Sequence, residues 1–305
     1  MFKNERRKGI LLAFIATLAL ANVYIFSKAA LNEVHLFQFG FYWFGFALIL
    51  NMIFIRITKK KIKLNQINRK AWYAISLNSF FEVLGTILFF SAIKLINNPA
   101  VVSFIVNLGP IFTIVLGFFI LNERFKLIEY GGIVITLIGV LIINYNTETA
   151  FADLFSTGTL IVVFSSLFFS IAVIVAKKNI QKIEPVLLTS SRAILLFLIS
   201  FILVLKEGLS FSIDLNPLLY IAGGTFMGPF LAILSSYYSF KYIEVSISNI
   251  IISTKSVLVI IGAYFFFDAI MSGNQLIGGA LTIVGIIVIS MAKQIKKILN
   301  FKKTL

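Results

Sequence analysis

Ten long apolar segments divide the sequence, and they limit the possible folds more than any other feature of the chain. A helix that crosses the hydrocarbon core of a bilayer needs about 20 consecutive, mainly apolar residues. Only 13% of the residues are charged, against about 25% in soluble domains. The sequence therefore predicts an all-α polytopic membrane protein with ten transmembrane helices, near residues 9–28, 35–55, 72–93, 98–121, 128–145, 157–176, 185–205, 217–240, 245–267 and 274–293.

The basic residues lie mainly on one side of the predicted membrane. With ten spans, both termini and every second connection face the same side, and the connection 56–70 alone carries seven Lys and Arg residues. Because Lys and Arg accumulate in cytoplasmic loops, both termini are predicted to be cytoplasmic. The net charge of +15 is therefore interpreted as the topology signal of a multi-pass protein of the cell's inner (plasma) membrane, and no nucleic-acid partner is expected.

The residue types that most enzymes and metal sites need are scarce. The chain has no cysteine and a single histidine, His35. One histidine cannot build a metal cluster or a histidine-activated nucleophile. A dyad of Lys255 with Ser253 or Ser256 is disfavoured because neighbouring residues on a helix do not face each other. Neither an enzymatic activity nor a cofactor is predicted, and with no nucleotide-binding loop any transport would be driven by a gradient or an exchange.

The two halves of the sequence resemble each other weakly. Residues 9–28 align without a gap on residues 158–177, and the alignment matches Lys28 with Lys177. Each predicted half, 1–147 and 148–305, has five spans, so the second half enters the membrane from the opposite side. Inverted repeats of this kind are typical of secondary transporters, whose substrate site lies near mid-membrane between the repeats.

Polar and charged side chains interrupt several spans and form the candidate transport site. Glu82 and Lys255 fall near mid-depth, where a charge costs about 2.5–3.5 kcal/mol on insertion scales. We expect the two side chains to face each other across an aqueous cavity, and a purely structural pair is the alternative. Arg192 is a further candidate, unless its side chain extends to the cytoplasmic interface. The predicted substrate-binding residues are Asn22, Asn78, Glu82, Asn107, Arg192, Ser253 and Lys255, and the predicted helix breaks with a role in gating are Pro110 and Pro229.

Parts of the sequence resemble the EamA-type family of the drug/metabolite transporter superfamily. The resemblance is carried by "ALANVYIFSKAAL", by "FFSAIKLINNPAVVSFIVNLGPIFTIVLGFFILNERF" and by "GGIVITLIGVLII". Pro110 and the pair Glu123–Arg124 occupy the positions of the family's fourth-helix proline and following "E-R". The second half departs from the pattern, because Lys255 stands close to where the repeat of Pro110 would fall and only Asp268 corresponds to the "E-R".

The resemblance implies the fold, the transporter class and export, and it leaves the substrate open. From the charged residues, the hypothesis is export of amino acids or related zwitterions by alternating access. Arg192 or Lys255 would then bind the carboxylate and Glu82 the amine. The alternatives are an organic-anion or lipid-linked metabolite transporter or exchanger. A proton is one candidate coupling ion, and homodimerisation in the lipid bilayer is left open.

Overall fold

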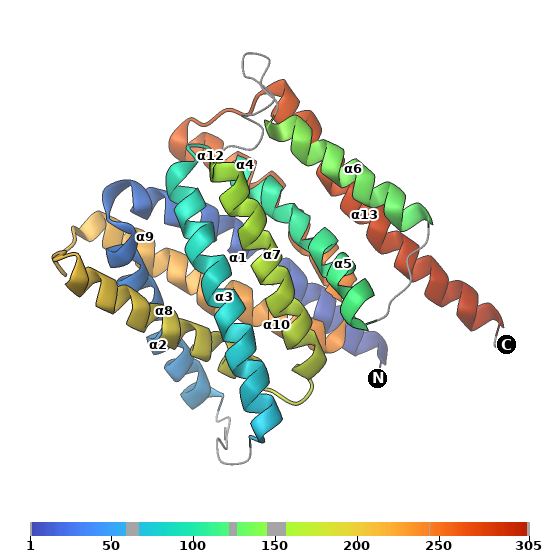
Figure 1. Ribbon diagram of the computed structural model, residues 1–305, viewed down its shortest axis with the longest axis horizontal. Helices are drawn as coiled ribbons and strands as arrows, with labels where there is room; N and C mark the ends of the chain where they lie inside the picture. The colour runs from blue at the N-terminus through green and yellow to red at the C-terminus, as the bar shows by residue number, and fades with distance from the viewer. Residues whose placement is uncertain (1, 59–66, 122–126, 145–156, 244, 304–305) are drawn as a thin grey trace.

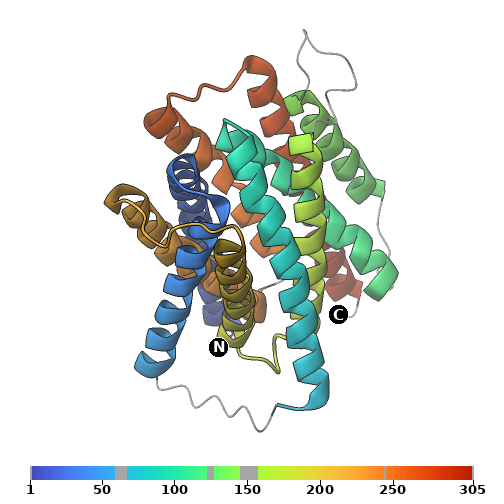
Figure 2. The same ribbon diagram turned by 60° about the vertical axis from the view of Figure 1, so that its left-hand side comes forward.

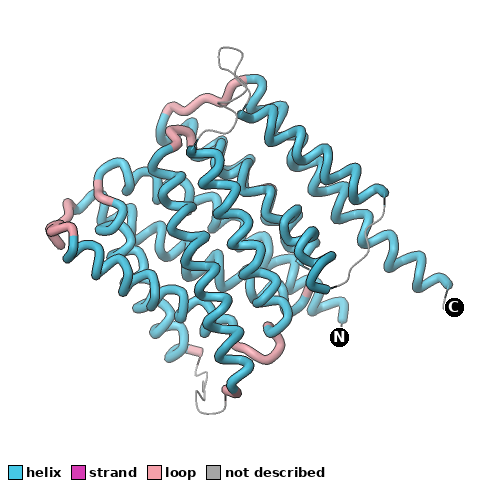
Figure 3. The backbone as a smooth tube through the Cα atoms, viewed as in Figure 1, coloured by secondary structure: helices cyan, strands magenta, loops and turns pink. Residues whose placement is uncertain are grey.

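The structure is a computed structural model of the chain, and it describes residues 2–58, 67–121, 127–144, 157–243 and 245–303. Within these ranges the chain is helical apart from turns and short connections, and no strand is present (Figure 3). Helices are expected in a bilayer because a helix satisfies its own backbone N–H and C=O groups where no water is available. The "E-R" pair Glu123–Arg124 lies outside the described residues.

The helices follow one another with short connections. In chain order they are α1 (Phe2–Glu33), α2 (Leu36–Ile57), α3 (Arg69–Leu95), α4 (Pro99–Ile105), α5 (Gly109–Leu121), α6 (Leu127–Asn144), α7 (Thr157–Asn179), α8 (Pro185–Lys206), α9 (Leu215–Thr225), α10 (Ile233–Tyr242), α11 (Val245–Ser253), α12 (Lys255–Phe267) and α13 (Gly273–Lys303). A 3₁₀ turn, Val106–Leu108, separates α4 from α5, and a π-helical stretch, Phe226–Ala232, joins α9 to α10.

Among the described residues, eight helical stretches are long and apolar enough to cross a membrane. Three of them combine two helices, because α4 with α5, α9 with α10, and α11 with α12 each form one span. Two shorter apolar stretches, Tyr130–Gly139 in α6 and Gly273–Val288 in α13, correspond to the remaining predicted spans. An all-helical protein with multiple spans is thus confirmed, whereas the number ten stays a prediction.

The helices form a central group with one helix pair at each edge (Figures 1 and 2). α6 lies beside α13 at one edge, and α2 packs against α8 at the other. Between these pairs, α3 packs along α7, and α1 packs along α9 and α10. α1 begins and α13 ends at the same end of the molecule (Figure 1). We refer to this end as the inner end and to the opposite end as the outer end.

The pair of α6 and α13 is held by close backbone approach. A Cβ atom at Gly139 would lie 2.6 Å from the carbonyl oxygen of Gly278, and one at Gly285 would lie 2.6 Å from that of Gly132. Small residues allow transmembrane helices to approach this closely. Gly131 is different, because a Cβ atom there would meet no heavy atom within 4 Å.

Local backbone chemistry explains where the central helices are interrupted. Pro110 is the second residue of α5, a position where its missing N–H costs nothing. The carbonyl of Val106, which loses its usual donor to that proline, accepts a hydrogen bond from the amide of Gly109. Pro229 lies inside the π-helical stretch, which accommodates a ring that would clash in a regular α-helix. A third interruption, at Thr254, separates α11 from α12.

Two glycines make room for the largest buried side chain. Trp43 on α2 is fully buried, and its indole leaves no room for a Cβ atom at Gly224 and little room at Gly228. The Cβ of a residue at position 228 would be 3.1 Å from Cζ2 of Trp43, and the contact at position 224 is closer still. These glycines therefore allow α2 and α9 to approach each other, and Oγ1 of Thr225 donates to the carbonyl of Trp43 at 3.2 Å.

We predict that Gly224→Ala destabilises the protein by about 1–3 kcal/mol, the usual cost of overpacking a filled core. The matched control is Gly131→Ala, which adds the same methyl group to a helix at an open position and is expected to leave stability unchanged or slightly higher. Thermal unfolding of the purified protein in detergent would compare the two variants. Equal melting temperatures for Gly224→Ala and the parent protein would contradict the packing described above.

Candidate functional site

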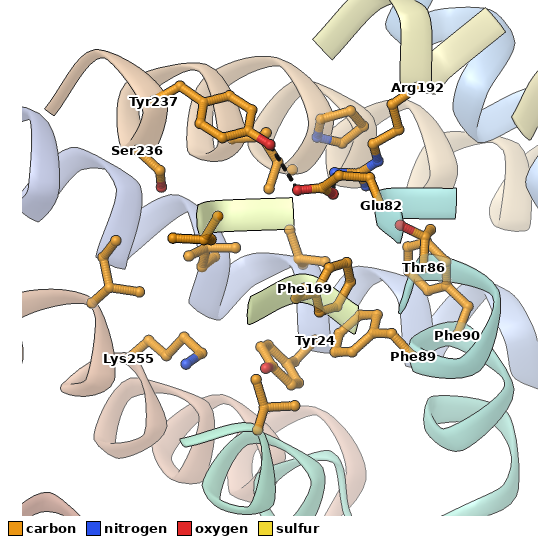
Figure 4. Close-up of a pocket in the computed structure, with 18 of the residues that line it drawn as sticks. Tyr24, Glu82, Thr86, Phe89, Phe90, Phe169, Arg192, Ser236, Tyr237 and Lys255 are labelled. Atoms are coloured by element: carbon orange, nitrogen blue, oxygen red, sulfur yellow. Dashed lines mark hydrogen bonds and ion pairs between the residues drawn. The ribbon is translucent and has the colours of Figure 1, made fainter. Parts of the chain in front are cut away.

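A cavity of about 210 Å³ lies in the middle of the central helices (Figure 4). Residues from α1, α2, α3, α7, α8, α10, α11 and α12 contribute to its wall, as do the π-helical stretch and the 3₁₀ turn. Both halves of the sequence therefore line the same space. The wall is mainly apolar, and its charged residues are Glu82, Arg192 and Lys255.

Aromatic side chains form much of the wall. Tyr24 packs edge-on against Phe89, with 5.2 Å between ring centroids, and Trp43 packs against Phe90 at 5.3 Å. Phe169 on α7 adds a further ring, 6.4 Å from Phe89. The apolar rings of this wall suit the apolar body of a small molecule.

Glu82 on α3 is held by two donors from other helices. Nη1 of Arg192 on α8 lies 2.9 Å from Oε2 of Glu82, and the hydroxyl of Tyr237 on α10 donates to Oε1 at 2.7 Å (Figure 4). Both charged side chains are more than nine-tenths buried. The pairing is required because a buried charge is tolerated only with a partner of opposite charge or with strong hydrogen bonds.

A layer of polar groups behind this pair holds it in place. Nδ2 of Asn78 donates to the carbonyl of Ala172 at 2.9 Å and lies 3.4 Å from the hydroxyl of Tyr237. Nearby, the hydroxyls of Ser79 and Ser191 are 2.6 Å apart and join α3 to α8. The carboxylate is therefore fixed on three helices.

Lys255 lies across the cavity from this group (Figure 4). It is the first residue of α12, it is 5% exposed, and its Nζ donates to Oδ1 of Asn107 at 3.3 Å. Asn107 in turn donates to the hydroxyl of Ser256 at 3.2 Å. Among the described residues, no carboxylate lies within ion-pair distance of Lys255. Lys255 is therefore a buried cation beside the cavity with only a neutral partner.

The structure changes the predicted pairing. Glu82 and Lys255 line the same cavity, as expected, but the alternative of a structural ion pair between them is wrong in this state, because Arg192 pairs with the carboxylate. The length of the Lys255 side chain does not explain this pairing. The start of α8 brings Arg192 inward beside α3, and this also rules out its extension to the membrane interface in this state.

The other predicted residues differ in their positions relative to the cavity. Pro229 lines the cavity, and Asn78 and Asn107 lie behind it and contact residues that line it. Ser253 is buried and donates to the carbonyl of Asn249 in its own helix at 2.7 Å. Asn22 is exposed and donates to the carbonyl of Leu18, so its inclusion in the site is not supported by its position. Pro110 lies outside the lining residues, beside the interruption of its helix.

Sequence reasoning missed Tyr237 and the aromatic wall. Tyr237 belongs to the block "YYSFK", in which nothing in the sequence marks one tyrosine as the partner of a carboxylate. Trp43 belongs to an aromatic run that resembles lipid-facing sequence. The signal that distinguishes Trp43 is the pair of glycines at positions 224 and 228, which becomes meaningful only when α2 and α9 are known to be neighbours.

An all-helical protein with several membrane spans and a charge-bearing cavity between them has the features of a membrane transporter for small molecules. The chain belongs to the EamA-like transporter family, which matches residues 7–145 and again residues 156–291. It is similar to an uncharacterized transporter of Methanothermobacter thermautotrophicus, with 24% identity over 93% of this chain and 87% of that protein. An uncharacterized transporter of Archaeoglobus fulgidus is also 24% identical, over 63% of this chain and 68% of the relative.

A solved crystal structure shares the fold. It superposes with a TM-score of 0.66 and covers 96% of this chain and 98% of its own, at 17% sequence identity.

We predict that Glu82→Gln destabilises the protein by about 3–5 kcal/mol, because it leaves the buried guanidinium of Arg192 without its counter-charge. The control is Glu184→Gln, which alters the partly exposed ion pair with Lys241 at 3.6 Å and should cost about 0–1 kcal/mol. Unfolding in mixed micelles would measure both. The double variant Glu82→Gln/Arg192→Gln should be less destabilised than the sum of its single variants, and simple additivity would show that the pair is not coupled.

Proposed function

We propose that the protein is a secondary transporter that carries a small metabolite across the plasma membrane by alternating access through this cavity. In this proposal the chain has ten spans in two inverted halves, 1–147 and 148–305, with both termini in the cytoplasm. The observation that carries the proposal is the cavity itself, which is lined by both halves and has ionisable groups at mid-span. Such groups inside a membrane mark substrate or ion pathways.

The pattern of helix contacts supports the inverted repeat. If α1 corresponds to α7, and α3 to α9 with α10, then the packing of α3 on α7 corresponds to the packing of α1 on α9 and α10. The two-fold relation exchanges α2 with α8 and α6 with α13, so each of these packed pairs is mapped onto itself. A two-fold relation between the halves accounts for all of these contacts.

The same contacts suggest which parts move. α1 packs on α9, α10, α11 and α12, whereas α7 packs on α3, α4 and α5. We call these groups the first bundle (α1, α2 and α9–α12) and the second bundle (α3–α5, α7 and α8). Each bundle mixes helices of both halves, so we propose that the bundles rock against each other, in place of the two halves as the repeat alone suggests. The α2–α8 and α6–α13 pairs would connect them at the edges.

The charge of the cavity favours an anionic substrate. Glu82 and Arg192 neutralise each other, and Lys255 is left with a neutral partner, so the charged residues of the wall sum to one positive charge when all are ionised. We therefore propose that the substrate is a small organic acid with an apolar body, bound through its anionic group to Lys255. This reverses the preference derived from the sequence, because Glu82 already has two donors.

Export of an amino acid or related zwitterion is the second candidate. It is favoured by the fact that Glu82 still lines the cavity, where its carboxylate could receive an ammonium group in another state of the protein. Export as the direction of transport rests on the family resemblance. The proton is proposed as the coupling ion only because titratable groups lie beside the cavity.

Three compounds with the same apolar body distinguish these candidates. Phenylpropionate is an anion, phenylalanine a zwitterion and phenethylamine a cation. Flux of each would be measured in proteoliposomes with and without an imposed pH gradient. We expect saturable flux of phenylpropionate, and we expect Lys255→Gln to lower kcat/KM at least about tenfold, the effect of one lost hydrogen bond to a charged group.

The matched control is Lys206→Gln, which removes an exposed lysine at the end of α8 outside the cavity. It should leave the flux unchanged. Flux of phenylalanine without that of phenylpropionate would favour the zwitterion, and equal flux through Lys255→Gln and the parent protein would remove Lys255 from the site.

A further inference from the structure

Lys28 is a second buried lysine, and the proposed substrate site does not use it. It lies on α1 and is 5% exposed. Its Nζ donates to the backbone carbonyls of Ile93 at 3.1 Å, Lys94 at 3.4 Å and Ile96 at 3.0 Å. Within the described part of the chain, no carboxylate lies within ion-pair distance of it. The ammonium is therefore held by the main chain alone.

The three carbonyls belong to the last turn of α3 and the residue that ends it. Carbonyls at a helix C-terminus lack helical donors and carry a partial negative charge, so a cation is stabilised there. Lys28 thus joins the outer end of α1 to the outer end of α3. Because α1 belongs to the first bundle and α3 to the second, this contact crosses the boundary between the bundles.

The two ends of the molecule differ in their contacts between bundles. At the outer end α1 approaches α3, and α4 packs against α12. The two-fold relation would place α7 beside α10, and α5 beside α11, at the inner end. In the described residues, neither of these pairs makes a comparable backbone approach. The bundles therefore approach each other through the backbone at the outer end, whereas at the inner end they meet through side chains, such as Lys241 of α10 with Glu184 at 3.6 Å.

The lysine that aligns with Lys28 lies at the other end of the molecule. Lys177, near the end of α7, is exposed at the inner end. The two-fold relation maps the last turn of α3, which binds Lys28, onto the last turn of α10. There the side-chain amide of Gln181 donates to the carbonyl of Lys241 at 3.3 Å.

We infer that Lys28 is a latch that closes the outer end of the cavity by binding the last turn of α3. This inference rests on the proposed transport function. When the bundles rock to open the outer end, the Lys28 contact opens. Lys28 is thus a positioning residue that sets the balance between the two states without contacting the substrate.

The absence of cysteine allows a direct test by thiol accessibility. Thr86→Cys places a reporter in the cavity wall at a side chain whose hydroxyl has no hydrogen-bond partner, so little is lost by the exchange. A membrane-impermeant maleimide added to intact cells would label this thiol only when the outer end opens. We expect Lys28→Met in this background to raise the labelling rate about tenfold, the change that one lost hydrogen bond to a charged group produces.

Lys206→Met is the matched control, because Lys206 is an exposed lysine at the outer end of α8. It should leave the labelling rate unchanged. An unchanged rate in a monodisperse Lys28→Met protein, with the thiol still labelled in inside-out vesicles, would overturn the latch and leave the transport proposal standing. Failure to label the Thr86→Cys thiol from either side in any variant would overturn the transport proposal, and the latch with it.

A second measurement does not depend on the folding of Lys28→Met. The hydroxyl of Ser256 on α12 donates to the carbonyl of Ser103 on α4 at 3.1 Å, within the contact of α4 with α12 that joins the bundles. A disulfide in Ser103→Cys/Ser256→Cys should stop both flux and outer labelling of the Thr86→Cys thiol, and a reductant should restore them. Unimpaired flux with the disulfide formed would show that this end does not open during transport.

Discussion

The ion pair between Glu82 and Arg192 joins α3 to α8 inside the membrane-spanning part of the protein, where neither group could be left unpaired. The hydroxyl of Tyr237 adds α10 to the same group. With its own acid neutralised in this way, the cavity takes its electrostatic character from Lys255, whose partner is the neutral amide of Asn107. The position of one arginine thus decides whether the cavity is suited to an ammonium group or to an anion.

The fold contains two kinds of helix contact with different consequences. Contacts inside each bundle run along whole helices, as between α3 and α7, and are reinforced by hydrogen bonds such as that from Ser165 to the carbonyl of Gly85 at 2.7 Å. Apart from the α2–α8 edge, contacts between the bundles are local: at the outer end they are Lys28 and the contact of α4 with α12, and elsewhere they include Tyr237 with Glu82 and Lys241 with Glu184. Small local contacts can be exchanged at low cost, whereas long packed interfaces move as units. This division is the basis of the rocking motion that we propose.

The sequence predicted the helical membrane fold and the family because both depend on long-range composition and on repeats. It also predicted that Glu82, Lys255 and Pro229 would lie at the cavity, because polar residues inside a span can be recognised from the sequence alone. The partner of Glu82 could not be predicted in this way. Sequence gives the depth of a residue in the membrane, but the facing direction of each helix depends on how it packs. Asn22 illustrates the limit, since its depth is suitable and its side chain points away.

The packing of Trp43 against Gly224 and Gly228 affects the intrinsic fluorescence of the protein. The chain contains two tryptophans, Trp43 in the cavity wall and Trp72 near the start of α3, where it is 44% exposed. The side chain of Trp43 is fully buried, and its Nε1 has no hydrogen-bond partner among the described residues, so its emission lies toward the blue and responds to changes in its surroundings. Rearrangement of the outer aromatic wall therefore changes the intrinsic fluorescence of the protein, and the fold contains its own spectroscopic reporter.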